Sequence, residues 1–384
     1  MPNVLIDIRP TQNVHRKSGI GRYAKNLISR LPRIDPENSY HFLHYDGAGL
    51  PELPDVIKQK VAFLPFPKNK PRIGDGKRWG RVAREHRIDL IHILDIETPY
   101  PLPPAVKVLC TVHDLIPAIH PDFSYYKMGM PRRWKNRLRY AFYINNLHKV
   151  DGIIAVSENT KKDVVRIGGV GPEKISVVYE GVNFDDLQEA GGETGVLQKY
   201  GIREPYILHL GGLDRRKNIL RLLESYREAN IPDHQLVIAG KSREDMKAIE
   251  EVIARLRLEK QVHLPGFIDD ADLKPIYSNA AFFVYLSLYE GFGLPVLEAM
   301  AAGTPVITSN VSSIPEIAGD AACLVNPEDT AEIASALRRF AEGGADREEL
   351  VTRGRQRASH FSWGRTAAET ISVYRKAFQG AIAP

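Results

Sequence analysis

The sequence predicts an α/β protein with two doubly wound domains, each built on a parallel sheet with helices on both faces. Three observations support this prediction. Short apolar segments alternate with amphipathic helical segments along nearly all of the 384 residues, which is typical of repeated strand–helix units. The chain length suits two domains of ordinary size. A stretch near 183–204, rich in Gly, Asp and Glu, separates two series of such units, and we expect the domain boundary there.

The first series of predicted elements runs over the first 180 residues. Its strands are runs of Val, Ile, Leu and aromatic residues that are bounded by Gly, Pro or charged residues. We predict these strands near residues 3–8, 40–45, 60–64, 89–93, 107–112, 152–156 and 176–179. Apolar residues three and four positions apart predict helices near 20–31, 76–87, 131–149 and 158–166.

The second series repeats this alternation. Strands are predicted near 206–210, 235–239, 261–264, 281–286, 305–308 and 322–325. Helices are predicted near 217–229, 244–257, 270–278, 295–302, 330–342 and 347–359. A last helix over 361–379 follows a suitable N-cap, Ser362, and carries one apolar stripe of Ala367, Ile371, Tyr374 and Phe378. The stripe alone fits a helix that closes the second domain.

The composition is that of a globular protein. Hydrophobic residues make up 43% and charged residues 26% of the chain, which excludes disordered and fibrous classes. The apolar runs are shorter than the roughly 18 residues of a membrane span, and residues 1–7 read as a strand rather than as a signal peptide. Cys110 and Cys323 lie far apart in apolar runs, which argues against a disulfide framework or a zinc site. We therefore expect a cytoplasmic protein.

The net charge of +5 conceals an asymmetry between the two halves. Residues 1–180 carry 29 Lys and Arg against 18 Asp and Glu, a net charge of +11, whereas the remainder carries 23 against 29, a net charge of −6. The excess is concentrated in 68–87 and 132–139. A basic half indicates an anionic partner such as a lipid surface, a phosphorylated acceptor or a nucleic acid, and a merely solvated helix face is the alternative.

The segment that begins at Glu290 carries the strongest signal for a binding site. A predicted strand runs into a turn with two glycines, and Pro295 suits the first turn of the helix that follows. Free N–H groups at a helix start, together with the helix dipole, favour an anion. Glu290 would stand at the strand end, and Glu298 one turn into the helix could accept hydrogen bonds from a ribose diol. The alternatives are a turn-stabilising Glu290 and a solvent-facing Glu298.

A second segment, from His209 to Asn218, also follows a predicted strand and opens a helix. It contains Gly211 and the adjacent cations Arg216 and Lys217. Two neighbouring cations at a helix start suit a diphosphate. Taken alone, the same pair is also consistent with surface charge.

Two features of the first half allow more than one interpretation. Gly19, Gly21 and Ala24 fit the Gly-x-Gly-x-x-Ala spacing of a dinucleotide-binding turn. In that motif the glycines follow the strand directly, whereas here the first strand ends about ten residues earlier, which argues against a dehydrogenase. His113 ends an apolar strand, where an isolated histidine fits a structural role as well as a ligand contact.

The stretch from Glu290 through Val306 resembles the E-x7-E signature of the retaining glycosyltransferases of family 4, which have the GT-B fold. The resemblance implies Rossmann-like domains over 1–185 and 200–360 that face each other across a cleft, with the segment 361–384 crossing back to the first domain. It further implies that the first domain binds the acceptor and the second the nucleotide sugar.

The resemblance also implies roles for individual residues. In the family, the two glutamates of the signature contact the donor sugar and the nucleotide ribose, and these positions correspond to Glu290 and Glu298. The Arg and Lys of the strand–Gly–x4–Arg–Lys pattern grip the donor diphosphate, and a histidine at the cleft touches the sugar. The resemblance therefore gives His113, Glu290, Arg216 and Lys217 as catalytic residues. It gives as donor-binding residues Gly19, Gly21, Gly211, Ile268, Gly293, Leu294, Pro295 and Glu298.

The sequence departs from the family pattern at two positions. Many members have an arginine directly after the first glycine of the diphosphate segment, where this chain has Gly212. The missing cation would have to come from Arg215 or Arg216. Glu180, before Gly181, stands where relatives commonly have asparagine.

The function implied by the resemblance is transfer of a hexose from a nucleotide diphosphate sugar to a saccharide or lipid-linked acceptor, with retention of the α-configuration. Mannose from GDP-mannose is the first choice, followed by glucose or N-acetylglucosamine from UDP donors. The aspartates of the pairs Asp185–Asp186 and Asp269–Asp270 are adjacent rather than spaced as Asp-x-Asp, and we expect no metal and no cofactor. We expect no nucleic-acid partner, and a cytoplasmic location or peripheral contact with the anionic inner face of the membrane.

Two other classes of function stay open at this point. One is a GT-B enzyme of different chemistry, either a nucleotide-sugar epimerase or a phosphorylase. A phosphorylase would need a lysine that binds pyridoxal phosphate, and nothing in the sequence marks one. The other is a non-catalytic sugar-binding protein.

Overall fold

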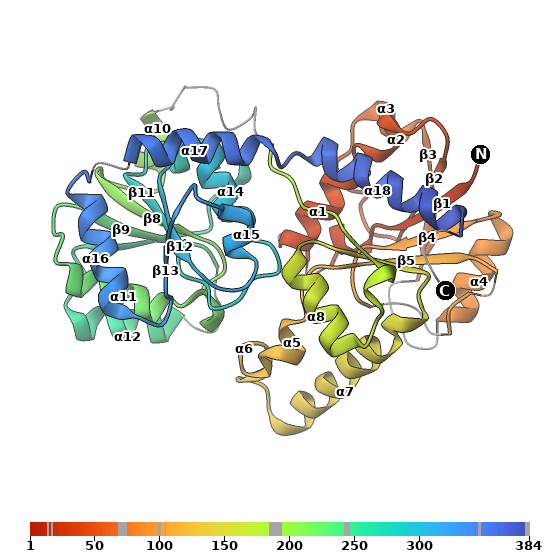
Figure 1. Cartoon of the computed structure of the whole chain (residues 1–384), viewed down its shortest axis with the longest axis horizontal. Helices are drawn as coiled ribbons and strands as arrows, with labels where there is room; N and C mark the ends of the chain where they lie inside the picture. Colours follow the sequence, from red (N-terminus) through yellow and green to blue (C-terminus); the bar gives the residue numbers. More distant parts are fainter. Residues whose placement is uncertain are drawn as a thin grey trace. The chain divides into compact units, whose positions relative to one another are not determined.

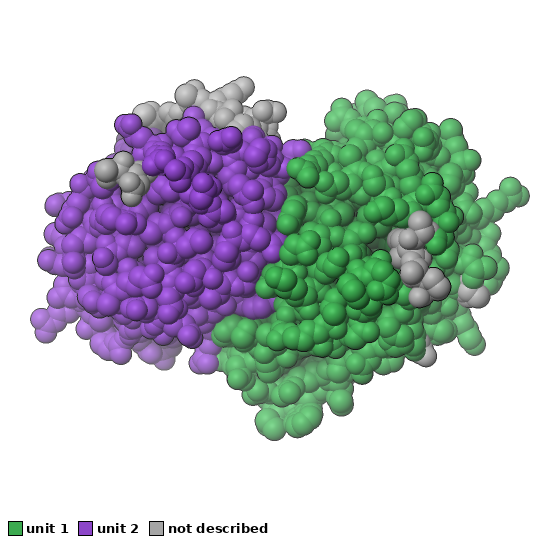
Figure 2. Space-filling view, viewed as in Figure 1, with its two compact units in different colours: residues 1–181, 363–384 green, residues 182–362 purple. Residues whose placement is uncertain are grey.

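The computed structural model describes residues 1–13, 15–16, 18–67, 75–97, 101–103, 105–183, 194–241, 246–344 and 347–380. The chain forms two compact units (Figures 1 and 2). Unit 1 comprises residues 1–181 and 363–384, and unit 2 comprises 182–362. Each unit is a parallel sheet with helices on both faces, so the predicted α/β class with two Rossmann-like domains is confirmed. The pair Asp185–Asp186, within the predicted domain boundary, lies outside the described residues.

Unit 1 contains a seven-stranded sheet in the order β3-β2-β1-β4-β5-β6-β7. All of its pairings are parallel, with Val4 opposite both Tyr40 and Leu90 in the centre. Strands buried on both faces read as continuous apolar runs, which explains why the sequence located them well. The strands are β1 Asn3–Asp7, β2 Ser39–Tyr45, β3 Val61–Phe66, β4 Leu90–Ile93, β5 Lys107–Val112, β6 Gly152–Ala155 and β7 Ile175–Val177.

The helices of unit 1 divide between the two faces of this sheet. Figure 1 shows α1, α2 and α18 along one face and α4, α7 and α8 along the other. The short helices α2, α3, α5 and α6 have only four or five residues, too few to show a helical period in the sequence. The helices are α1 Gly19–Ile28, α2 Leu31–Ile34, α3 Asp55–Lys58, α4 Gly76–Glu85, α5 Ile116–Ile119, α6 Pro121–Tyr125, α7 Met130–Asn146, α8 Glu158–Gly168 and α18 Trp363–Phe378.

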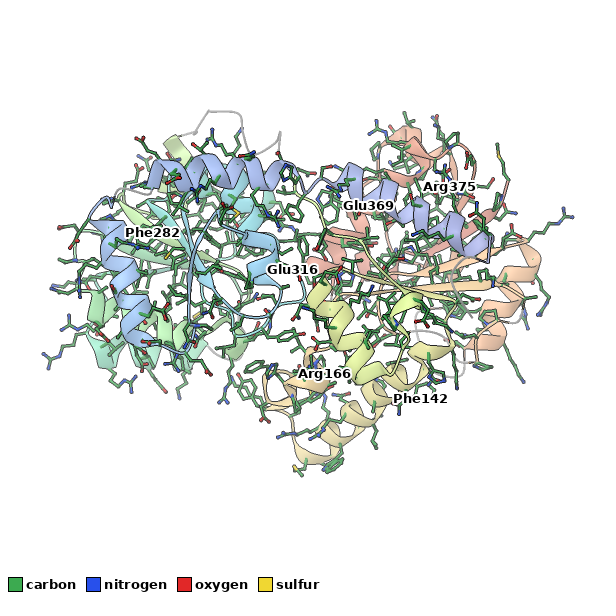
Figure 3. All side chains as sticks on the ribbon, viewed as in Figure 1. Phe142, Arg166, Phe282, Glu316, Glu369 and Arg375 are labelled. Carbon is green, nitrogen blue, oxygen red and sulfur yellow. The ribbon has the colours of Figure 1, made fainter. Side chains whose placement is uncertain are left out.

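Helix α18 belongs to unit 1 although it is the last helix of the chain. In its apolar stripe Ala367, Ile371 and Tyr374 are buried and Phe378 is half-buried, while Arg375 stands on the outward face (Figure 3). The Tyr374 hydroxyl lies 2.7 Å from Nδ1 of His92 on β4, and Nε2 of His92 lies 2.8 Å from the Thr111 hydroxyl. These buried hydrogen bonds tie the end of the chain to the centre of the first sheet.

Unit 2 contains a six-stranded parallel sheet in the order β10-β9-β8-β11-β12-β13. Its strands are β8 Tyr206–Leu210, β9 Gln235–Ala239, β10 Val262–Gly266, β11 Phe282–Tyr285, β12 Val306–Ser309 and β13 Cys323–Val325. Its helices are α10 Thr194–Lys199, α11 Ile219–Ala229, α12 Met246–Leu256, α13 Leu273–Ser278, α14 Leu294–Ala301, α15 Ile314–Ala318, α16 Thr330–Ala341 and α17 Arg347–Ser359.

The strand order of unit 2 identifies the edge of its sheet at which a ligand is expected. From β8 the chain proceeds outward to β9 and β10, then returns to β11 on the other side of β8. The connections therefore leave β8 and β11 toward opposite faces, and in sheets of this kind ligands bind beyond the carboxyl ends of such a pair of strands. Among the described helices, none has both the length and the apolar character needed to cross a membrane.

Replacement of Tyr374 by Phe tests how strongly α18 is held. The substitution removes the hydroxyl and leaves Nδ1 of the buried His92 without its partner, so the free energy of unfolding of unit 1 should fall by about 1–3 kcal/mol. All three tryptophans, Trp79, Trp134 and Trp363, lie in unit 1, so their fluorescence during urea denaturation reports on this unit alone. Ser372→Ala, on the exposed face of α18, is the matched control. Equal denaturation midpoints for the two variants would contradict the prediction.

Candidate functional site

The carboxyl ends of β8 and β11 hold the main group of candidate residues. Beyond β8 the chain passes through Gly211 into a single 3₁₀ turn, Arg215–Lys217, before α11 begins. Beyond β11 it passes through Glu290 to the start of α14. Since β8 and β11 are neighbours in the sheet, both loops meet at the edge where the topology predicts a ligand.

The 3₁₀ turn fixes the direction of its two cations. The Asp214 side chain caps the turn by accepting a hydrogen bond of 3.1 Å from the Arg216 amide. At the other end, Asn218 adopts a left-handed conformation with φ of 60°, and its side-chain nitrogen Nδ2 donates to the Pro327 carbonyl oxygen. Lys217 is thereby directed inward and is only 6% exposed, so its assignment to surface charge is wrong.

Three donors converge on one oxygen of Glu290. The Oε1 atom lies 2.5 Å from a guanidinium nitrogen of Arg216 and 2.6 Å from Nζ of Lys217. The Tyr285 hydroxyl donates to the same oxygen at 2.9 Å. Lys217 also contacts the Tyr285 hydroxyl and lies 4.5 Å from the centre of its ring. The predicted residues Arg216, Lys217 and Glu290 therefore form one buried cluster.

The cluster carries two positive charges and one negative charge. Burial alone would raise the pKa of Glu290, but the charges of Arg216 and Lys217 outweigh that effect and lower the pKa to about 2. Burial lowers the pKa of Lys217, and Arg216 lowers it further, while Glu290 opposes both. The carboxylate is thus held firmly ionised. Asp214 lies 3.6 Å from Arg216, so the two cations face two carboxylates, and a bound anion would compete with these for the cations.

Two residues of the cluster were not predicted from the sequence. Tyr285 is the last residue of β11, and burial together with the nearby Glu290 raises its pKa well above the usual value. His209 on β8 stacks on the Tyr285 ring, with the ring centres 5.7 Å apart, and its Nδ1 donates a hydrogen bond of 3.1 Å to the Val284 carbonyl oxygen. Burial and the charge of Lys217 lower the pKa of His209 to about 3, so the imidazole is neutral beside the lysine. A polar side chain within an apolar strand was the only sequence signal for either residue.

Helix α14 supplies the second glutamate. Gly293 precedes the helix with φ of +118°, a left-handed conformation that strongly favours glycine. Leu294 and Pro295 form the first turn, which leaves its amide groups at the carboxyl edge of the sheet. Glu298 is buried, so it is not the solvent-facing residue of the alternative interpretation, and its Oε2 accepts a hydrogen bond of 3.0 Å from Tyr277. Ile268 is also buried, two residues beyond β10.

The remaining candidate residues lie in unit 1. His113 directly follows β5, and its ring packs edge-on against Tyr23 of α1, with the ring centres 4.8 Å apart. Helix α1 begins at Gly19, where an added Cβ would meet open space. At Gly21 an added Cβ would lie 2.2 Å from the His15 carbonyl oxygen, so only glycine allows this close packing. The structure thus brings His113 and the α1 start together at one edge of the first sheet.

His113 forms an ion pair with Glu180, a residue for which no role was predicted from the sequence. Its Nδ1 lies 3.0 Å from Oε1 of Glu180, which is 4% exposed, and its Nε2 lies 3.3 Å from the Leu94 carbonyl oxygen. Glu180 and His113 are 67 positions apart in the sequence. Within the described ranges, no group of three or more His, Cys, Asp or Glu side chains is arranged to hold a metal ion.

Comparisons with known proteins agree with this arrangement. Residues 17–186 match the model of "Glycosyltransferase Family 4", and residues 197–357 match that of "Glycosyl transferases group 1". The chain is 28% identical over 382 residues to O-antigen chain mannosyltransferase B of Escherichia coli, covering 93% of this chain and 96% of that protein. It is also 28% identical over 284 residues to the serotype-specific mannosyltransferase WbdA of Escherichia coli, covering 71% of this chain but only 34% of that protein.

Solved structures show the same fold. A glycosyltransferase from Rickettsia africae superposes with a TM-score of 0.75 at 17% identity, over 98% of both chains. The two family models together span most of both units, and the E. coli mannosyltransferase B matches nearly end to end. This chain therefore belongs to the family 4 glycosyltransferases with the GT-B fold.

Proposed function

We propose that this protein transfers a hexose from a nucleotide diphosphate sugar to an acceptor hydroxyl, with retention of the α-configuration. The observation that carries the proposal is the convergence of Arg216 and Lys217 on Glu290. Two adjacent cations thus lie at the edge where the sheet topology predicts a ligand, and a diphosphate is the kind of anion that such a pair binds.

A nucleotide diphosphate suits this charge distribution. Its diphosphate would draw Arg216 and Lys217 toward itself, and the carboxylate of Glu290 would then be available to the hydroxyls of the sugar. Preorganised cations stabilise the negative charge that develops on a departing diphosphate more than they stabilise the bound donor, which is the condition for rate acceleration. Because the same two cations lower the pKa of Glu290 to about 2, its carboxylate is a weak base and a poor nucleophile.

The choice of sugar rests on the relatives. The E. coli protein that matches along nearly its whole length is a mannosyltransferase, and so is WbdA. We therefore propose mannose from GDP-mannose as the donor, ahead of glucose or N-acetylglucosamine from UDP donors, and a saccharide or lipid-linked acceptor. We further propose that the reaction needs no metal ion and takes place in the cytoplasm.

Loss of either cation should reduce transfer. With saturating donor, Arg216→Ala and Lys217→Ala should each lower kcat by ~10²–10³-fold, about 2.7–4 kcal/mol, as removal of one preorganised contact does elsewhere. The matched control is Arg227→Ala, which removes an exposed arginine of the following helix α11. Initial rates of sugar transfer measure the effect. Near-wild-type kcat in both Arg216→Ala and Lys217→Ala would refute the donor-site assignment.

The stereochemistry of the product tests the retaining mechanism. An α-linked donor should give an α-glycoside, which the one-bond C–H coupling at the anomeric carbon identifies by NMR. Turnover should persist in excess EDTA, and added Mg²⁺ should not increase it. A β-linked product would exclude retention, and a rate that EDTA abolishes and Mg²⁺ restores would exclude the metal-independent reaction.

Helix α7 is the proposed contact with an anionic membrane. Met130, Trp134 and Leu138, four residues apart, are 62%, 55% and 66% exposed and form an apolar stripe along one face of the helix. Arg132, Lys135, Arg137 and Arg139 are exposed around this stripe, and Arg137 lies over the Trp134 ring. Tyr140 of the same helix points away from this stripe, and its hydroxyl donates to the Asp114 carbonyl oxygen. An apolar stripe bordered by cations is typical of helices that lie on anionic bilayers.

Vesicle co-sedimentation tests this contact. At low salt the protein should partition to phosphatidylglycerol vesicles in preference to phosphatidylcholine vesicles, because each basic residue near an anionic surface contributes about 1 kcal/mol. Combined reversal of Arg132, Arg133 and Lys135 to Glu should remove the preference. Lys247→Glu, on the exposed face of α12, controls for a change in net charge elsewhere. Equal partitioning to both vesicle types, unchanged by the triple reversal, would indicate a merely solvated face.

A further inference from the structure

The contacts of His113 define its protonation state. Its Nδ1 faces Oε1 of Glu180 at 3.0 Å, and its Nε2 faces the Leu94 carbonyl oxygen at 3.3 Å. A carbonyl oxygen can only accept, so Nε2 must carry a proton. If the Glu180 carboxylate also accepts, Nδ1 carries a second proton, and the ring is an imidazolium ion.

We propose that Glu180 is a positioning residue that holds His113 as the doubly protonated cation at the carboxyl edge of the first sheet. The side chains of the pair are only 9% and 5% exposed, so water competes little for their hydrogen bond. A buried carboxylate needs a charged or donating partner, and His113 forms such a hydrogen bond with Glu180. A ring with protons on both nitrogens is a donor and cannot serve as a general base.

The groups around the ring favour the cation. Burial by itself lowers the pKa of His113, but the hydrogen bond and charge of Glu180, with the charges of Asp95 and Asp114, raise it above the usual value. His92 lies on the neighbouring strand β4, where burial and the charge of His113 lower its pKa to about 3, so that its ring is neutral. Tyr23, which packs against the ring from α1, is also neutral because burial raises its pKa.

The raised pKa of His113 determines how the stability of unit 1 depends on pH. Because the folded-state pKa of His113 is raised, the pair stabilises unit 1 fully below the unfolded value of about 6.5, and this contribution disappears as the pH rises through the folded value. A neutral ring with a protonated Glu180 is the competing arrangement. In that arrangement Nδ1 would be the acceptor and only Nε2 would carry a proton.

NMR of the protein with labelled histidine rings distinguishes the two arrangements. The His113 signals are assigned by their loss in His113→Gln, and their nitrogen shifts should show two protonated nitrogens at neutral pH, with His92 as a neutral internal reference. In Glu180→Gln, Nδ1 of His113 should lose its proton at a lower pH than in the wild type. In Glu180→Asp, the pH of this titration should lie between those of the wild type and Glu180→Gln. Glu173→Gln makes the same substitution at an exposed glutamate nearby and should leave the titration unchanged.

A pH profile gives a second readout, which rests on the proposed function. For transfer, Glu180→Gln should lower kcat/KM about tenfold at pH 8 and less than about twofold at pH 5.5, because His113 is cationic at low pH in both proteins. The titration needs no substrate, so an inactive protein with a doubly protonated His113 would refute the proposed function alone. One protonated nitrogen at neutral pH in the wild type would overturn the proposal, as would equal titrations in Glu180→Gln and Glu173→Gln. If Glu180→Gln does not fold, the wild-type spectrum and Glu180→Asp decide.

Discussion

Glu290 is the group on which the arrangement of unit 2's candidate site depends. It is the counter-charge that allows Lys217 to be buried, since an ammonium ion without a partner in the protein interior costs several kcal/mol. Lys217 lies beyond β8 and Glu290 beyond β11, so their ion pair also joins the ends of two neighbouring strands. One carboxylate therefore holds the local structure together and keeps both cations at the edge of the sheet where an anion is expected.

The sequence predicted the features that depend on short-range patterns. Buried parallel strands such as β5 and β8 are continuous apolar runs, and their predicted bounds agree with the structure to within one residue. The turn before α14 was recognised because Pro295 and its glycines have conformational requirements that other residues do not meet. The family resemblance implied that Arg216, Lys217 and Glu290 serve one donor site, but the ion pairs between them were not predicted from the sequence.

The rest depends on contacts between distant parts of the chain. Glu180 meets His113 because β5, β6 and β7 are neighbours in the sheet, and the sequence does not give the order of strands. Tyr285 resembles any other aromatic residue of a buried strand until Lys217 is placed beside it. The short helices α5 and α6 were missed because about four residues make only one turn. The direction of Tyr140 was also hidden, since a helix with basic residues all around gives no indication of its buried face.

The place of α18 in unit 1 has a consequence for synthesis of the protein on the ribosome. Unit 2 is one continuous segment and can fold as soon as its last residues emerge. Unit 1 cannot be completed at that stage, because the helix that covers Tyr23 and His92 is made last. The first domain in the sequence is therefore the second to be finished, and its uncovered apolar face is exposed for as long as translation of unit 2 lasts. That interval is when the nascent chain is most open to chaperones and to aggregation.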